Sequence, residues 1–142
     1  MDFRDAPDEA AFRAALRTWL EENLTDELRE LSSTITGERL DTLRSWSRRL
    51  HEAGYAGITW SLEVGGRGLA PRFQAIAHEE QARAGAPGHI GVIGLGMAGP
   101  TIAVHGTEAQ RTRYLLPILS AAELSLPISV IFVNNAIYGM TG

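Results

Sequence analysis

The sequence predicts an all-α domain of about five helices, followed by a strand-like C-terminal tail. Apolar residues recur at helical spacing in several segments of the first 120 residues. In addition, the stretch from His89 to His105 carries no charged residue and contains four glycines. A segment with so few polar groups, and with glycines that leave its surface nearly flat, is expected to be buried against a flat partner. That partner could be neighbouring helices, a sheet or a ligand.

The composition limits the size and class of the protein. The 142 residues suffice for one domain with a hydrophobic core. The chain has 17 acidic residues against 13 basic ones, all arginine, for a net charge of −4, so it lacks the basic stripe that nucleic-acid binding needs. Cysteine is absent, which excludes disulfides and thiolate chemistry. The acidic N-terminus predicts no signal peptide, and the glycine-rich run over 90–104 is too short for a membrane span. We therefore expect a soluble, cytoplasmic protein.

Three helices are predicted in the first 85 residues. The first covers about 7–23, because Phe12, Leu16 and Leu20 recur at helical spacing. A short helical turn is expected around Leu28. The second helix covers about 38–53 with Gly54 as its left-handed C-terminal residue, and the third runs from 71 to near 85. The glycine-rich loop over 65–68 between them is typical of a sharp turn, with a phosphate-binding loop as the less favoured interpretation.

Two further helices are predicted after residue 87. One covers about 88–104, with Pro100 kinking or dividing it. The last begins with a capping box, in which Thr107 is the N-cap and Gln110 lies three residues later. Pro117 disturbs this helix near its end.

The run from Gly94 through Gly96 to Gly99 matches the G-x-G-x-x-G pattern of dinucleotide-binding loops. That function would require a strand before the glycines, a helix directly after them and a second strand with an acidic residue. Because Pro100 follows at once, packing of a helix is the favoured interpretation. As one helix face, Val92, Ile93 and Gly96 would leave a groove wide enough for a slim apolar ligand or a close helix.

The histidines and paired glutamates do not predict a metal site. In the run from His78 to Ala82, alanine stands where a zinc-protease helix has its second histidine. The four histidines are expected at the surface or at helix caps. Glu79 and Glu80 point about 100° apart on a helix, which predicts surface charges, with a buried hydrogen-bonding role for one of them left open.

From residue 124 onward the chain has no charge. Residues 128–133 are β-branched, aliphatic and aromatic, which predicts a buried strand that ends at the turn-forming residues Asn134 and Asn135. We therefore expect a helical domain over 1–123 and an unmatched apolar tail over 124–142.

An ordered series of motifs resembles the N-terminal helical domain of acyl-CoA dehydrogenases over about residues 3–123. In chain order the motifs are Trp60 to Leu69, His78 to Glu80, Ala82 to Gly85, Gly99 to Ile102, His105 to Gln110 and Leu116 to Leu119. The resemblance implies an FAD-dependent oxidoreductase of fatty acid metabolism that removes hydrogens from the α and β carbons of acyl-CoA thioesters, usually as a homo-oligomer.

The resemblance also sets what this chain contributes. In that family a following β-domain holds most of the flavin and a C-terminal helical bundle supplies the glutamate base, so no catalytic residue is expected here and FAD should not bind this chain tightly. The N-terminal helices help to form the acyl pocket, and Val92, Ile93 and Gly96 are the candidate substrate-binding residues. Two alternatives stay open: a non-catalytic helical interaction domain, and a dinucleotide-binding fragment that uses Gly94 to Gly99.

The last fifteen residues resemble a different family, the thiamine-diphosphate subunit of 2-oxoacid:ferredoxin oxidoreductases. Carried over, the Asn135 side chain and the Ile137 carbonyl would bind the magnesium of the diphosphate. The Gly-Asp-Gly half of that motif is absent upstream, so a working thiamine site is not expected, and a truncated or fused reading frame is the simplest explanation.

Overall fold

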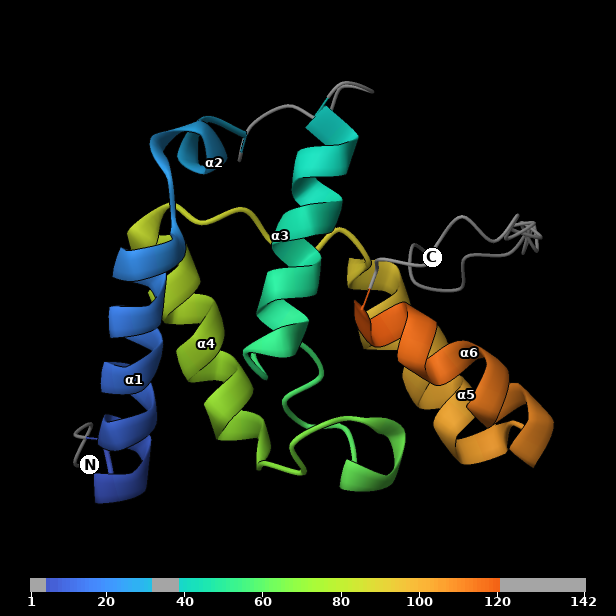
Figure 1. The fold of residues 1–142 in the computed structure, drawn as a ribbon. Coiled ribbons are helices and arrows are strands. Elements are labelled where there is room, and N and C mark those ends of the chain that lie inside the picture. The colour runs from blue at the N-terminus through green and yellow to red at the C-terminus, as the bar shows by residue number, and fades with distance from the viewer. Residues whose placement is uncertain (1–4, 32–38, 121–142) are drawn as a thin grey trace, which may run out of the picture.

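The computed structural model describes residues 5–31 and 39–120, and these residues form helices and connecting turns without a strand (Figure 1). The expected all-α class is confirmed. The elements in chain order are α1 (Pro7–Asn23), α2 (Asp26–Glu30), α3 (Leu40–Glu52), the 3₁₀ turn η3 (Leu62–Val64), α4 (Pro71–Ala84), the π-helical turn η4 (Gly94–Ala98), α5 (Gly99–His105) and α6 (Glu108–Ser120).

Two apolar clusters hold these helices together. The larger cluster contains buried residues of helices α1, α2, α3 and α4 together with Ile58 of the connection after α3. Leu16, Trp46 and Ile58 are almost fully buried in it. The smaller cluster joins Trp60 to Leu115, Ile118 and Leu119 of α6. Figure 1 shows α1 beside α4 at one side of the molecule, α5 beside α6 at the other, and α3 between the two pairs. The connection over 53–70 therefore links the two clusters, because it supplies one buried residue to each.

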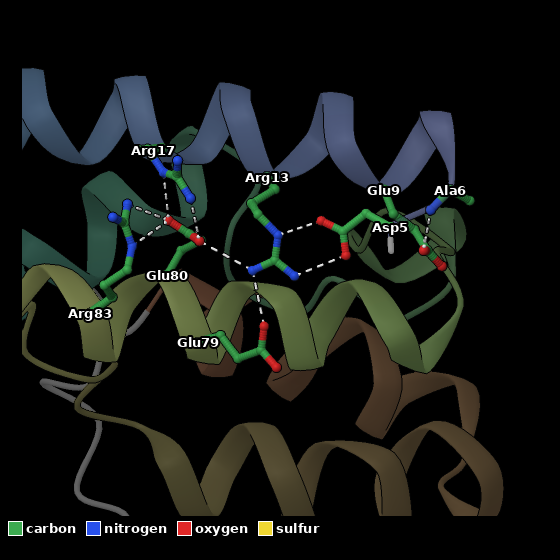
Figure 2. A network of polar contacts seen from close by, with 8 residues as sticks. All are labelled: Asp5, Ala6, Glu9, Arg13, Arg17, Glu79, Glu80 and Arg83. Atoms are coloured by element: carbon green, nitrogen blue, oxygen red, sulfur yellow. Dashed lines mark hydrogen bonds and ion pairs between the residues drawn. The ribbon is translucent and has the colours of Figure 1, made fainter. Parts of the chain in front are cut away.

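Helices α1 and α4 lie side by side and are joined by charged residues (Figure 2). The carboxylate of Glu80 accepts hydrogen bonds from Arg13, Arg17 and Arg83 at 2.7–3.1 Å. Glu80 is only 2% exposed, so the expectation of a surface charge is wrong for this residue, and the alternative of a buried hydrogen-bonding group is confirmed. Glu79 stays at the surface, with a 64% exposed side chain that meets Arg13 at 2.9 Å.

Most predicted helix ends agree with the structure. Gly54 and Gly85 follow α3 and α4 with φ of 75° and 70°, which is the left-handed conformation expected after a helix. The capping box before α6 is formed, because Thr107 N–H donates to Gln110 Oε1 at 2.8 Å and Gln110 N–H donates to Thr107 Oγ1 at 3.3 Å.

The structure of residues 88–104 differs in two ways from the single helix that the sequence predicts. Residues 88 and 89 have no regular secondary structure and residues 90 and 91 form a turn, so helical structure begins only at Val92. It then widens into the π-turn η4, where Gly99 N–H donates to the carbonyl of Gly94, five residues earlier. Because residues 89–93 form no strand and the glycines lie inside helical turns, the dinucleotide-binding interpretation of Gly94 to Gly99 is wrong.

The glycine loop over 65–68 uses its own amides within the turn. Gly66 N–H donates to Ser61 O at 3.0 Å, and Gly68 N–H donates to Trp60 O at 2.7 Å. A phosphate cradle needs such N–H groups to be free. The interpretation as a sharp turn is therefore confirmed.

The strand over 128–133, the domain boundary at 123 and the magnesium ligands Asn135 and Ile137 all lie outside the described residues, and these expectations stay predictions. Among the described helices, none combines the length and hydropathy needed to cross a bilayer. The cytoplasmic location also stays a prediction.

Candidate functional site

A cavity of about 330 Å³ lies between the end of α3, the 55–60 connection, α4 and the segment over 88–100. Its walls come from elements that belong to both apolar clusters. The lining residues are Leu50, Tyr55, Ala56, Gly57, Thr59, Trp60, Gln74, His78, Gln81, Gly88, His89, Val92, Leu95, Gly96 and Pro100.

One wall of the cavity is apolar and is set by the Trp60 indole. The indole packs so closely on Gly99 that a Cβ at position 99 would overlap the ring. Its Nε1–H donates to the carbonyl of Leu95 at 3.3 Å. These two contacts fix the helical segment over 92–100, so Val92, Leu95 and Pro100 complete the apolar wall.

The stretch that leads into this wall is anchored from α3. Trp46 Nε1–H donates to Pro87 O at 2.7 Å, and Ile90 N–H donates to Ser47 Oγ at 2.9 Å. Ser47 is fully buried. Loss of either α3 partner would leave a backbone polar group of the 87–90 stretch without its hydrogen bond.

His89 joins the same stretch to the end of α6. Its Nδ1 accepts from Gly91 N–H at 2.9 Å, which leaves the proton on Nε2, and Nε2–H then donates to Leu119 O at 3.1 Å. Burial lowers the pKa of His89 below the usual histidine value, while its hydrogen bond to Leu119 opposes that change. The expectation that all four histidines lie at the surface or at caps is therefore wrong for His89, which is 8% exposed.

A second part of the lining is polar and comes from one face of α4. Gln74, His78 and Gln81 lie at i, i+4 and i+7, so they share a face of the helix. The side chains of Gln74 and His78 meet at 2.9 Å between their Nε2 atoms. The cavity therefore has two chemically different sides.

The structure separates the three predicted substrate-binding residues. Val92 and Gly96 line the cavity, and a Cβ at Gly96 would meet no atom within 4 Å. Ile93 is not among the lining residues, although its exposed fraction of 74% is close to the 64% of Val92. Successive helical residues point about 100° apart, so Ile93 cannot share the direction of Val92. Ile93 instead lies with Met97, which is 68% exposed, on an outer apolar surface.

The described residues offer little for a metal or for FAD. They contain no group of three histidine, aspartate or glutamate side chains able to hold a metal ion. The cavity lining contains no arginine, and a diphosphate needs cationic side chains or free amides. The lining therefore does not fit the diphosphate of FAD.

Comparison with known proteins agrees with this architecture. The family described as acyl-CoA dehydrogenase, N-terminal domain, matches residues 6–122. The acyl-CoA dehydrogenase IpdE1 of Mycolicibacterium smegmatis is 36% identical over 118 residues, which cover 80% of this chain and 30% of that protein. The acyl-CoA dehydrogenase FadE26 of Mycobacterium tuberculosis is 31% identical over 124 residues, 86% of this chain and 30% of that protein.

Solved structures give the same result. The ChsE4–ChsE5 complex from Mycobacterium tuberculosis matches with a TM-score of 0.72 and 27% identity, over 86% of this chain and 30% of that chain. A structure described as the Tcur3481–Tcur3483 steroid ACAD matches with a TM-score of 0.72 and 33% identity, over 86% of this chain and 31% of that chain. The chain thus spans about 30% of the length of the curated relatives that it matches. By its fold and its sequence, this chain belongs to the acyl-CoA dehydrogenase family, in which it corresponds to the N-terminal domain.

Proposed function

We propose that this chain supplies part of the acyl-binding pocket of an FAD-dependent acyl-CoA dehydrogenase, which oxidises acyl-CoA thioesters between their α and β carbons. The observation that carries the proposal is the apolar wall of the cavity. Trp60, Val92 and Leu95 present hydrocarbon surface on one side of an open space of about 330 Å³. Burial of an acyl group there would remove apolar surface of both ligand and protein from water.

The flavin and the catalytic base would come from protein beyond these helices. Bound FAD would supply the acceptor for the hydride. The role of this chain would be to hold the acyl group and to keep water away from its apolar part, since the described lining offers no arginine for a diphosphate. We also propose a domain boundary after residue 123, so that residues 1–123 form the acyl-binding domain and residues 124–142 form a separate tail. The thiamine-family likeness of that tail remains a proposal.

The relatives also suggest the setting in which this domain works. Two of the matched structures carry names that join two components, ChsE4 with ChsE5 and Tcur3481 with Tcur3483, and one of these is described as a steroid enzyme. We propose that this chain works within an assembly of acyl-CoA dehydrogenase subunits and that its acyl group is bulky and alicyclic.

A second function, as a non-catalytic interaction domain, is favoured by one observation. Large apolar side chains are exposed outside the cavity; they are Leu62, Ile93, Met97, Val104 and Leu116. Such a surface is typical of a protein contact. A chain that binds partner subunits but no acyl thioester would support this second function over the first.

Calorimetric titration with the N-acetylcysteamine thioester of cyclohexylbutanoic acid tests the acyl-binding proposal. We expect saturable binding to the 142-residue chain. We expect at least tenfold weaker binding to Gly96→Leu, because the leucine would extend from a position with open space in front of it and fill the cavity. Ala98→Leu is the matched control, since Ala98 is exposed in the same turn and is not a lining residue. Equal binding by Gly96→Leu and the native chain would contradict the proposal.

A further inference from the structure

Helix α4 presents two different stripes of side chains. Phe73, Ala77 and Glu80 are buried, and Glu80 meets the arginines of α1. The residues that follow each of these, namely Gln74, His78 and Gln81, are rotated by about 100° and line the cavity. The fold of α1 against α4 therefore determines that this polar stripe faces the cavity.

The polar stripe has unused hydrogen-bonding capacity. An amide nitrogen only donates, so Gln74 Nε2 is the donor in its 2.9 Å contact with His78 Nε2. That contact leaves Gln74 Oε1 as an acceptor and His78 Nδ1–H as a donor. The Gln81 side chain makes no hydrogen bond with any residue in the described ranges 5–31 and 39–120. By contrast, both ring nitrogens of His89 are already engaged, so the neighbouring histidine offers nothing to a ligand.

The polar stripe contains no carboxylate, lysine or arginine. Its two amides and its imidazole suit a hydroxyl, which can both donate and accept a hydrogen bond, or a carbonyl oxygen, which can accept one. They do not suit a carboxylate or a phosphate, because the cavity lining holds no arginine. Elsewhere in the lining, Trp60, Val92 and Leu95 offer no polar side-chain group apart from the Trp60 N–H, which is already bonded to Leu95 O. The hydroxyls of the lining belong to Tyr55 and Thr59 of the 55–60 connection.

From this arrangement we infer that the cavity selects an acyl group that carries a hydroxyl or keto oxygen on the side facing α4, in preference to a plain hydrocarbon. Gln74, His78 and Gln81 are then specificity-determining residues. The inference rests on the proposed function, since it assumes that the acyl group occupies this cavity. A plain hydrocarbon would cover the amides of α4 without replacing the hydrogen bonds that water gives them.

Two matched ligands test the inference on the native chain. The first is the N-acetylcysteamine thioester of cyclohexylbutanoic acid, and the second is the same thioester with a hydroxyl on the far carbon of the ring. We expect the hydroxylated ligand to bind about tenfold more tightly, which corresponds to one well-formed hydrogen bond. Equal affinities would overturn the inference and leave the proposed function intact. Failure of both ligands to bind would instead refute the proposed function, and the inference with it.

A double variant tests whether the side chains of α4 cause the preference for the hydroxylated ligand. In the double variant Gln74→Leu, Gln81→Leu, the preference for the hydroxylated ligand should fall to about twofold or less, while the plain ligand binds at least as well as before. Gln74 and Gln81 are only half-buried and make no hydrogen bond with the described residues of α1, so we expect the substitutions to leave the α1–α4 packing in place. A tenfold preference that survives in this variant would show that another wall recognises the oxygen, which would overturn the assignment to these residues. The preference in the native chain can be read without any variant, so the test does not depend on folding of the double mutant.

Discussion

The indole Nε1–H of Trp60 donates a hydrogen bond to the carbonyl oxygen of Leu95 across 35 residues of sequence. In the π-turn, Gly99 N–H donates to Gly94 O, five residues earlier. If this pattern continued, the backbone N–H of residue 100 would donate to Leu95 O. Residue 100 is proline and has no N–H. The side chain of Trp60 thus satisfies the carbonyl that Pro100 leaves without a backbone donor, and it also forms the apolar wall of the cavity.

This relationship predicts coupling between Trp60 and Pro100. Trp60→Phe should lower the free energy of unfolding by about 2 kcal/mol, because the Leu95 carbonyl loses its donor and the smaller ring fills less space. In a Pro100→Ala background the loss should be about 1 kcal/mol smaller, since an alanine at this position can supply the missing N–H. Urea unfolding of the four proteins forms a double-mutant cycle that measures this difference. Additive effects would contradict the role assigned to Pro100.

Gly96 and Gly99 are three residues apart and should respond to alanine in opposite ways. At Gly96 a Cβ meets open space, so Gly96→Ala should raise the free energy of unfolding by about 0.5–1 kcal/mol through helix propensity alone. At Gly99 a Cβ would overlap the Trp60 ring, so Gly99→Ala should lower it by about 1–3 kcal/mol. Both residues lie in a helical conformation, so each is the control for the other. Equal effects of the two substitutions would show that Trp60 does not pack on Gly99 in solution.

Glu80 should stabilise the contact between α1 and α4 at neutral pH. Glu80→Gln should lower the free energy of unfolding by about 3 kcal/mol at pH 7, because Arg13 and Arg17 would lose the carboxylate that they share. The matched control is Glu79→Gln, which should change it by less than about 0.5 kcal/mol, since the Glu79 side chain is 64% exposed. A small effect of Glu80→Gln would contradict the assigned role of the buried carboxylate.

The lowered pKa of Glu80 should make the free energy of unfolding depend on pH in the acidic range. Hydrogen bonds from Arg17, Arg83 and Arg13 lower the pKa of Glu80 to about 2, against the opposing effect of burial. A carboxyl with a lowered pKa stabilises the folded state fully above its unfolded pKa of about 4.3, and this stabilisation is lost as the pH falls towards 2. Chemical unfolding between pH 6 and 3 should therefore show a steeper loss of stability for the native chain than for Glu80→Gln. Parallel curves would contradict the lowered pKa.

Local sequence patterns were sufficient to predict most helices of the described structure. The ends of α1, α3, α4 and α6 follow from periodic apolar residues, from proline at a first turn, from the capping box at Thr107 and from glycine after a helix, all of which depend on neighbours within a few residues. The same kind of spacing placed Val92, Ile93 and Gly96 on one side of a helix, and of these three Val92 and Gly96 line the cavity.

The features that the sequence did not predict depend on contacts between distant residues. Glu80 is buried because Arg13 and Arg17 lie 67 and 63 residues away in the sequence and beside it in the fold. The Leu95 carbonyl of the π-turn accepts a hydrogen bond from Trp60, and no local sequence pattern predicts a donor 35 residues away. The polar stripe of α4 did carry a signal, because Gln74, His78 and Gln81 recur at helical spacing, but only the packing against α1 shows that this stripe faces a cavity.

Photo-crosslinking with an acyl thioester that carries a diazirine near the end of its acyl group tests the central claim most directly, because it reports which side of the 92–100 segment the ligand touches. If the acyl group occupies the cavity, mass spectrometry of the labelled chain should place the crosslinks on Trp60, Val92 and Leu95, and excess unlabelled thioester should prevent them. Crosslinks confined to the outer residues Ile93, Met97 and Val104 would contradict the claim.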